Sequence, residues 1–147
     1  MRFFSRYLMR DRVNAPMKSQ LKNIKNRRVI ATAFGAPDLI RIVNETSLPE
    51  PQPGEVRIRV EASSAVFTDT FIRRGLYPFL SVEPPFTLGY DVVGVIDKLG
   101  EGVTGFQPGL RVADLSQIGG NADYCIRPAT HLVPVPDRID PAEAVSL

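Results

Sequence analysis

Residues 55–61, Glu55-Val-Arg-Ile-Arg-Val-Glu61, alternate charged and β-branched side chains without interruption. Successive side chains of a β-strand point to opposite faces, so the pattern predicts a half-buried strand with Val56, Ile58 and Val60 directed into a core. The preceding stretch, Leu48-Pro-Glu-Pro-Gln-Pro-Gly54, carries alternate prolines that lack the N–H a strand ladder or helix needs. We therefore expect a stiff loop over 48–54 that leads into this strand.

On either side of this strand, short apolar runs separated by Gly and Pro are typical of a mainly β domain. A short helix is expected over 68–74, with Thr68 as N-cap and Gly75 at its end, and a second helix begins at Asp140, before Pro141 and Glu143. Because only seven residues follow Asp140, we expect the sequence to stop inside that helix. Further strands are predicted over 28–34 and 39–43, which form a hairpin, and over 88–96, 110–113, 123–127 and 131–135.

A length of 147 residues suffices for one domain, and its charge is unevenly distributed. Residues 1–28 carry nine Lys or Arg and one acid, whereas residues 29–147 carry nine Lys or Arg and fifteen acids. The globular part would repel phosphate, so we expect no nucleic-acid partner for it. The basic tail, residues 1–27, is open to several interpretations: a disordered arm, residues ahead of the true start, an organellar presequence, or a contact with a membrane surface or nucleic acid.

The single cysteine, Cys125, excludes an internal disulfide and any site that needs several thiolates, and it indicates a reducing compartment such as the cytoplasm. No run approaches the roughly 20 apolar residues of a membrane-spanning helix. We therefore expect no membrane span.

Six segments, in one order over residues 28–147, resemble the N-terminal, GroES-like domain of the medium-chain dehydrogenase/reductases, in the zinc-independent quinone oxidoreductase branch. They are Leu48-Pro-Glu-Pro-x-Pro-Gly-Glu55, Thr68-Asp-Thr-x-Ile-Arg-Arg-Gly-Leu-Tyr77, Gly89-Tyr-Asp-Val-Val-Gly94 with Gly100, Gly109-x-Arg-Val112, Gly119-Gly-x-Ala-x-Tyr124 and Leu132-Val-Pro-Val-Pro-Asp137. The resemblance implies a mainly β, partly open barrel with short helices over 28–147. In this family a Rossmann domain follows. The one G-x-G-x-x-G stretch here, Gly100-Glu-Gly-Val-Thr-Gly105, lacks the strand-to-helix context of a dinucleotide-binding loop, and we expect that domain to be absent from this chain.

The resemblance also implies a chemistry without zinc. Zinc-dependent relatives bind the metal at positions that here are Val66, Tyr90 and Asp91, and this set lacks the three ligands that an open zinc site needs. Cys125 and His131 are expected in core or surface roles. The implied reaction is hydride transfer from NADPH to a small quinone or conjugated carbonyl, and the implied dimer forms through the absent domain.

Within that resemblance, Tyr77 is the leading polar group for the substrate, since a phenol has an apolar body and a hydrogen-bonding tip. Thr70 matches the family motif as a second catalytic candidate, and Asp69 is expected to serve the start of the helix. Val66, Phe71 and Tyr90 are expected to line the pocket. Val66 and Phe71 replace the usual Asn and Tyr of the branch, which suits a bulkier, more apolar acceptor of the kind used by enoyl-thioester reductases.

Two functions stay open at this point. The first is the substrate-side domain of an NAD(P)H-dependent reductase, inactive alone and unable to bind NADPH at micromolar levels because the phosphate-binding loop is missing. The second is a non-catalytic lone GroES-like domain, a remnant or a binding module. The apolar face that starts at Ala144 and Val145 favours the first function, because it leaves an apolar surface for a partner domain.

Overall fold

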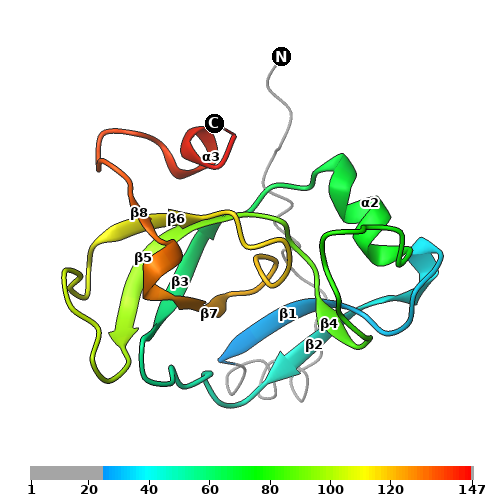
Figure 1. The fold of residues 1–147 in the computed structure, drawn as a ribbon, viewed down its shortest axis with the longest axis horizontal. Coiled ribbons are helices and arrows are strands. Elements are labelled where there is room, and N and C mark those ends of the chain that lie inside the picture. Colours follow the sequence, from blue (N-terminus) through cyan, green and yellow to red (C-terminus); the bar gives the residue numbers. More distant parts are fainter. Residues whose placement is uncertain (1–24, 147) are drawn as a thin grey trace, which may run out of the picture.

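The computed structural model describes residues 25–146, which fold into two antiparallel sheets (Figure 1). The smaller sheet has the order β2-β1-β4 and the larger one the order β7-β3-β5-β6-β8. The strands are β1 (Asn26–Ala31), β2 (Ile40–Glu45), β3 (Glu55–Ala62), β4 (Phe86–Thr87), β5 (Val92–Leu99), β6 (Arg111–Asp114), β7 (Tyr124–Pro128) and β8 (Val133–Pro134).

Strand β3, predicted over 55–61, is an interior strand of the larger sheet and pairs with β5 and β7. Val56 and Ile58 are fully buried, as the alternating pattern predicts. Val60 is only half-buried, because the pairing with β5 shifts register between Val60 and Ala62. The core around β3 consists of buried residues from five segments, namely Val56, Ile58, Val92, Ile96, Val112, Cys125 and Leu132.

Strand β1 joins the two sheets into a partly closed barrel. The Val29 N–H donates to the Asn121 carbonyl at 2.9 Å, and the Asp123 N–H donates to the Arg27 carbonyl at 3.0 Å. The Arg27 guanidinium also forms an ion pair with the Asp123 carboxylate at 2.8 Å. The predicted mainly β, GroES-like fold class and the 28–43 hairpin are confirmed, although β1 begins two residues earlier than expected, at Asn26.

The continuous strand predicted over 88–96 is wrong at its start. Gly89 has a φ of +107°, which breaks the run, so that β5 begins only at Val92. A Cβ at Gly89 would collide with the backbone nitrogen of Asn121, so the loop before β7 approaches the chain closely at this point. Residues 88–91 therefore form a turn between the two sheets that this loop holds in place.

Four short helical segments connect the strands: η1 (Pro37–Leu39), α2 (Phe67–Arg73), η2 (Ala129–His131) and α3 (Pro141–Ala144). The predicted cap of the last one is confirmed, since the Asp140 side chain accepts a hydrogen bond from the Ala142 N–H at 2.9 Å. Gly75 follows α2 with a φ of +71°, as expected of a helix-terminating glycine. The predicted N-cap at Thr68 is wrong, because α2 begins at Phe67 and Val66 takes that position.

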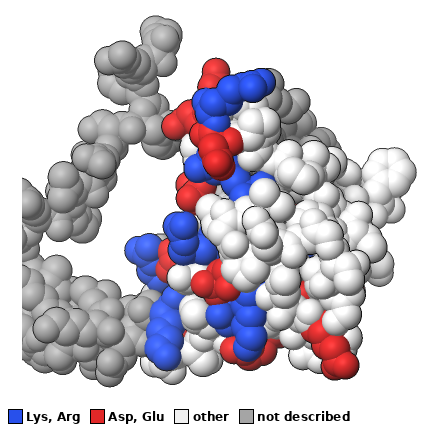
Figure 2. All heavy atoms as spheres, turned by 90° about the vertical axis from the view of Figure 1, so that its left-hand side faces the viewer, with Lys and Arg blue, Asp and Glu red and all other residues white. Residues whose placement is uncertain are grey.

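Charges of both signs mix on the surface of the larger sheet (Figure 2). Ion pairs link strands there: Arg57 on β3 pairs with Asp97 on the neighbouring β5, and Arg111 on β6 pairs with Glu61 on β3. None of the helices in residues 25–146 is long and apolar enough to cross a membrane. Of the basic tail predicted over 1–27, residues 1–24 lie outside the described part of the chain.

Candidate functional site

The segment that leads into α2 is tied to the start of β5 by a carboxylate. Asp91 accepts a hydrogen bond from the Ser64 backbone N–H at 2.7 Å and a second, very short one from the Ser64 hydroxyl. The residues are 27 positions apart, so no local pattern could reveal this pairing, and the sequence analysis missed Ser64. These bonds position the 63–66 segment against the turn that carries Tyr90.

A second carboxylate fixes the first turn of α2. Asp69 accepts a hydrogen bond from the Val66 N–H at 3.0 Å through one oxygen, which explains why the helix begins one residue earlier than Thr68 predicts. Its other oxygen, Oδ1, is buried without a hydrogen-bond partner among the described residues. Burial raises the pKa of Asp69, and the negative charge of Asp91 adds to that rise.

Two of the three predicted pocket residues line the same cavity. Val66 and Tyr90 border a space of about 450 Å³ at the N-terminal end of α2. Phe71 is not among its lining residues: it is 38% exposed and packs edge-on against the exposed Phe67, with ring centroids 5.1 Å apart. The cavity is completed by Ser64, Thr68, Asp91, Leu115, Val145 and Ser146.

Tyr77 and Tyr90 meet through their hydroxyl groups. The two oxygens are 3.0 Å apart, and the rings stand nearly perpendicular, at 87°, with centroids 6.1 Å apart. Tyr77 also borders a separate space of about 200 Å³ formed with Phe34, Ile72 and the 80–83 segment. The hydrogen bond to Tyr77 raises the pKa of Tyr90, and burial adds to it. The two bonded phenols thus lie between two spaces: Tyr90 borders the 450 Å³ cavity and Tyr77 borders the 200 Å³ space.

Thr70, the second catalytic candidate, borders neither cavity. Its hydroxyl donates to the Phe67 carbonyl at 2.7 Å, within the same helix. Its one donor is therefore used locally, which leaves Tyr77 and Tyr90 as the polar groups that the structure brings together.

The positions that bind zinc in the zinc-dependent relatives do not fit a metal here. Val66 has no donor atom, the Tyr90 hydroxyl is bonded to Tyr77, and Asp91 is bonded to Ser64. A catalytic zinc needs three protein ligands among Cys, His and carboxylate. Nowhere in residues 25–146 do three His, Cys, Asp or Glu side chains gather.

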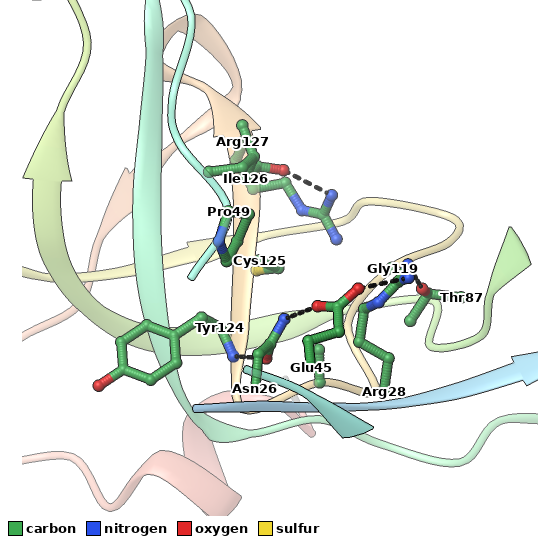
Figure 3. Close-up of a pocket in the computed structure, with 11 residues that line it drawn as sticks. Asn26, Arg28, Glu45, Pro49, Thr87, Gly119, Tyr124, Cys125, Ile126 and Arg127 are labelled. Carbon is green, nitrogen blue, oxygen red and sulfur yellow. Dashed lines mark hydrogen bonds and ion pairs between the residues drawn. The ribbon is translucent and has the colours of Figure 1, made fainter. Parts of the chain in front are cut away.

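A polar cavity of about 300 Å³ lies between the two sheets (Figure 3). Its polar groups are bonded to one another: Arg28 to Thr87 and Glu45, and the Asn26 side chain to Glu45 and the Tyr124 backbone N–H. The Tyr124 ring points away from these residues (Figure 3). These interactions link the two sheets, and we assign no ligand to this cavity.

Cys125 and His131 lie away from the tyrosine pair. Cys125 is buried in the core, and burial raises the pKa of its thiol to about 11. His131 is exposed and borders a fourth space, of about 430 Å³, with Leu115 and Val133.

Comparison with known proteins agrees with this fold. Residues 52–137 match the family model described as the alcohol dehydrogenase GroES-like domain. Over 124 residues the chain is 32% identical to the quinone oxidoreductase of Rattus norvegicus, a match that covers 82% of this chain and 37% of the rat protein. It is 35% identical over 108 residues to the 2-haloacrylate reductase of a Burkholderia species, covering 72% of this chain and 32% of that enzyme.

Among solved structures, a mycobacterial protein in complex with NADPH superposes with a TM-score of 0.69 at 32% identity, covering 80% of this chain and 34% of that one. The chain thus spans about a third of the length of these relatives. The family-model match covers strands β3 to β8 and both tyrosines of the site. The chain belongs to the alcohol dehydrogenase GroES-like domain family.

Proposed function

We propose that residues 25–146 form the substrate-side domain of a zinc-free, NAD(P)H-dependent reductase whose acceptor is a quinone or a conjugated carbonyl. The observation that carries the proposal is the Tyr77–Tyr90 hydroxyl pair, 3.0 Å apart beside a largely apolar cavity. Family membership supplies the reaction class, and the rat quinone oxidoreductase and the Burkholderia 2-haloacrylate reductase indicate the two kinds of acceptor.

In this role the chain's residues bind the acceptor and stabilise its developing charge. When a carbonyl acceptor receives a hydride, negative charge grows on its oxygen, and a fixed O–H donor lowers the energy of that charge. In the proposal the donor is the bonded Tyr77–Tyr90 hydroxyl pair, of which Tyr90 borders the 450 Å³ cavity. Val66 and Leu115 supply apolar surface that excludes water. Val66 in place of a polar side chain favours an acceptor with one polar edge and an apolar body.

The nicotinamide cofactor supplies the hydride when it is bound. Its phosphates need a glycine-rich loop at a helix N-terminus. The one G-x-G-x-x-G stretch of the sequence, residues 100–105, instead lies between strands β5 and β6, and no helix follows it there. Residues 25–146 therefore do not fit the diphosphate, and we assign them the acceptor alone. The single free Cys125 fits a reducing compartment, and we propose the cytoplasm.

Equilibrium binding of duroquinone to the purified chain tests this proposal, because its four methyl groups block thiol addition to the quinone ring. A neutral hydrogen bond contributes about 0.5–1.5 kcal/mol, so Tyr77→Phe should raise the dissociation constant about 2–12-fold. Tyr124→Phe is the matched control, since Tyr124 does not border the 450 Å³ cavity, and it should leave the dissociation constant unchanged. Equal affinity of Tyr77→Phe and the parent chain would refute the proposed role of Tyr77.

A further inference from the structure

The polar residues around the 450 Å³ cavity differ in charge. Four of them carry neutral hydroxyl groups, namely Ser64, Thr68, Tyr90 and Ser146, and Asp91 is the only charged residue among the described residues that border the cavity. We propose that Asp91 is a specificity-determining residue, whose negative charge selects an uncharged acceptor for this cavity and repels an acceptor that carries a carboxylate. This inference rests on the proposed function, and it names the charge class of the acceptor.

Asp91 has no cationic partner in the part of the chain that the structure describes. Both of its hydrogen bonds come from neutral donors, the Ser64 backbone N–H and the Ser64 hydroxyl. Such bonds stabilise a carboxylate without cancelling its charge. Asp114 differs in this respect, because its carboxylate lies 3.2 Å from the Arg127 Nε. The cavity is therefore bordered by a carboxylate whose charge no neighbouring cation offsets.

The groups around Asp91 add negative charge. Burial raises the pKa of Asp69 in the first turn of α2, and the charge of Asp91 adds to that rise, which shows that the two carboxylates lie close together. Asp91 also borders the adjoining 430 Å³ space, with Asp114 and the exposed His131. Among the described residues, no Lys or Arg borders either the cavity or this space. An anion in this region therefore meets like charge and no guanidinium or ammonium group.

Two ligands of nearly the same shape separate the effect of charge from that of size. Trans-cinnamamide and trans-cinnamate both have a carbonyl conjugated to an apolar body, but only cinnamate is an anion at pH 7. Repulsion between like charges about 4 Å apart weakens binding at least about fivefold in surroundings like water, and by more at lower dielectric. We therefore expect the purified chain to bind cinnamamide at least about fivefold more tightly than cinnamate at low ionic strength, and added salt should reduce this preference.

A lysine at the edge of the cavity tests whether charge sets the preference. Leu115 borders the cavity and is 66% exposed, so Leu115→Lys adds a positive charge there and leaves the bonds between Asp91 and Ser64 in place. Ile42→Lys is the matched control, because Ile42 is 69% exposed on β2 and borders neither the cavity nor the adjoining space. Leu115→Lys should reduce the preference for cinnamamide at least about twofold, and Ile42→Lys should leave it unchanged.

Asp91→Asn removes the charge itself and keeps one acceptor oxygen for Ser64. It should bring the two dissociation constants within about twofold of each other, and Leu115→Lys decides the question alone if Asp91→Asn does not fold. A parent chain that binds cinnamate as tightly as cinnamamide would overturn the inference and leave the proposed function in place. A preference that Leu115→Lys does not change would also overturn it. If the parent chain binds neither duroquinone nor cinnamamide, the proposed function fails, and this inference fails with it.

Discussion

Replacing Asp91 by Ala should destabilise the part of the fold that carries the candidate site. The change removes both acceptors of Ser64 and leaves the Ser64 N–H and hydroxyl without partners in a half-buried place. A hydrogen bond to a charged group contributes about 1.5–3 kcal/mol, and water can replace part of it at half-buried positions. We therefore expect a loss of about 2–4 kcal/mol in the free energy of unfolding, which corresponds to roughly 8–16 °C in Tm for a domain of this size.

Urea unfolding followed by far-UV circular dichroism measures this loss at an unchanged m value. Asp91→Asn keeps one acceptor oxygen, so it should lose about half as much as Asp91→Ala. Asp38→Ala is the control, because Asp38 is exposed in η1 and should change stability by less than about 0.5 kcal/mol. An Asp91→Ala chain as stable as this control would refute the structural role given to Asp91.

Three further changes test other parts of the fold. The pKa of Asp69 is raised in the folded state, so its contribution to stability is fully present below about pH 3.9 and is lost as the pH rises through the folded pKa. The free energy of unfolding, measured with urea from pH 3 to pH 7, should therefore decline in the parent chain. Asp69→Asn should lack this part of the decline. The Cys125 thiol, with a pKa of about 11 in the core, should react with Ellman's reagent at pH 8 only after guanidinium unfolds the chain, and fast reaction of the folded chain would contradict its burial. Gly120→Ala should cost about 1–3 kcal/mol, measured by urea unfolding, because the new Cβ would collide with the Asp91 carbonyl oxygen; parental stability would show that the loop can move away.

The strands that are set by local pattern could be predicted from the sequence. Alternation in 55–61 gives β3 because one face meets the core and the other meets solvent, and Asp140 caps its helix through a bond to a residue two positions away. The break at Gly89 could not be predicted in this way. It depends on the close approach of Asn121, and the sequence alone does not show that contact.

The candidate site, like the fold, could be predicted only in part from the sequence. Tyr77 and Tyr90 were identified by resemblance to the family, but their hydroxyl contact depends on how an irregular segment folds back over 13 residues. The hydrogen bonds between Ser64 and Asp91 could not be predicted for the same reason. Thr70 matches the family motif and Phe71 stands where the branch usually has Tyr, yet neither borders the cavity that Val66 and Tyr90 share.

The most direct test of the acceptor site is to map duroquinone onto the chain by amide chemical shifts in ¹⁵N–¹H spectra. The account predicts saturable shifts at Ser64, Val66, Thr68 and Tyr90, the residues around the 450 Å³ cavity, and none at Cys125 or Arg127 beside the polar cavity. Shifts confined to Cys125 and Arg127, or no saturable shift at all, would contradict the claim that this domain binds the acceptor beside the tyrosine pair.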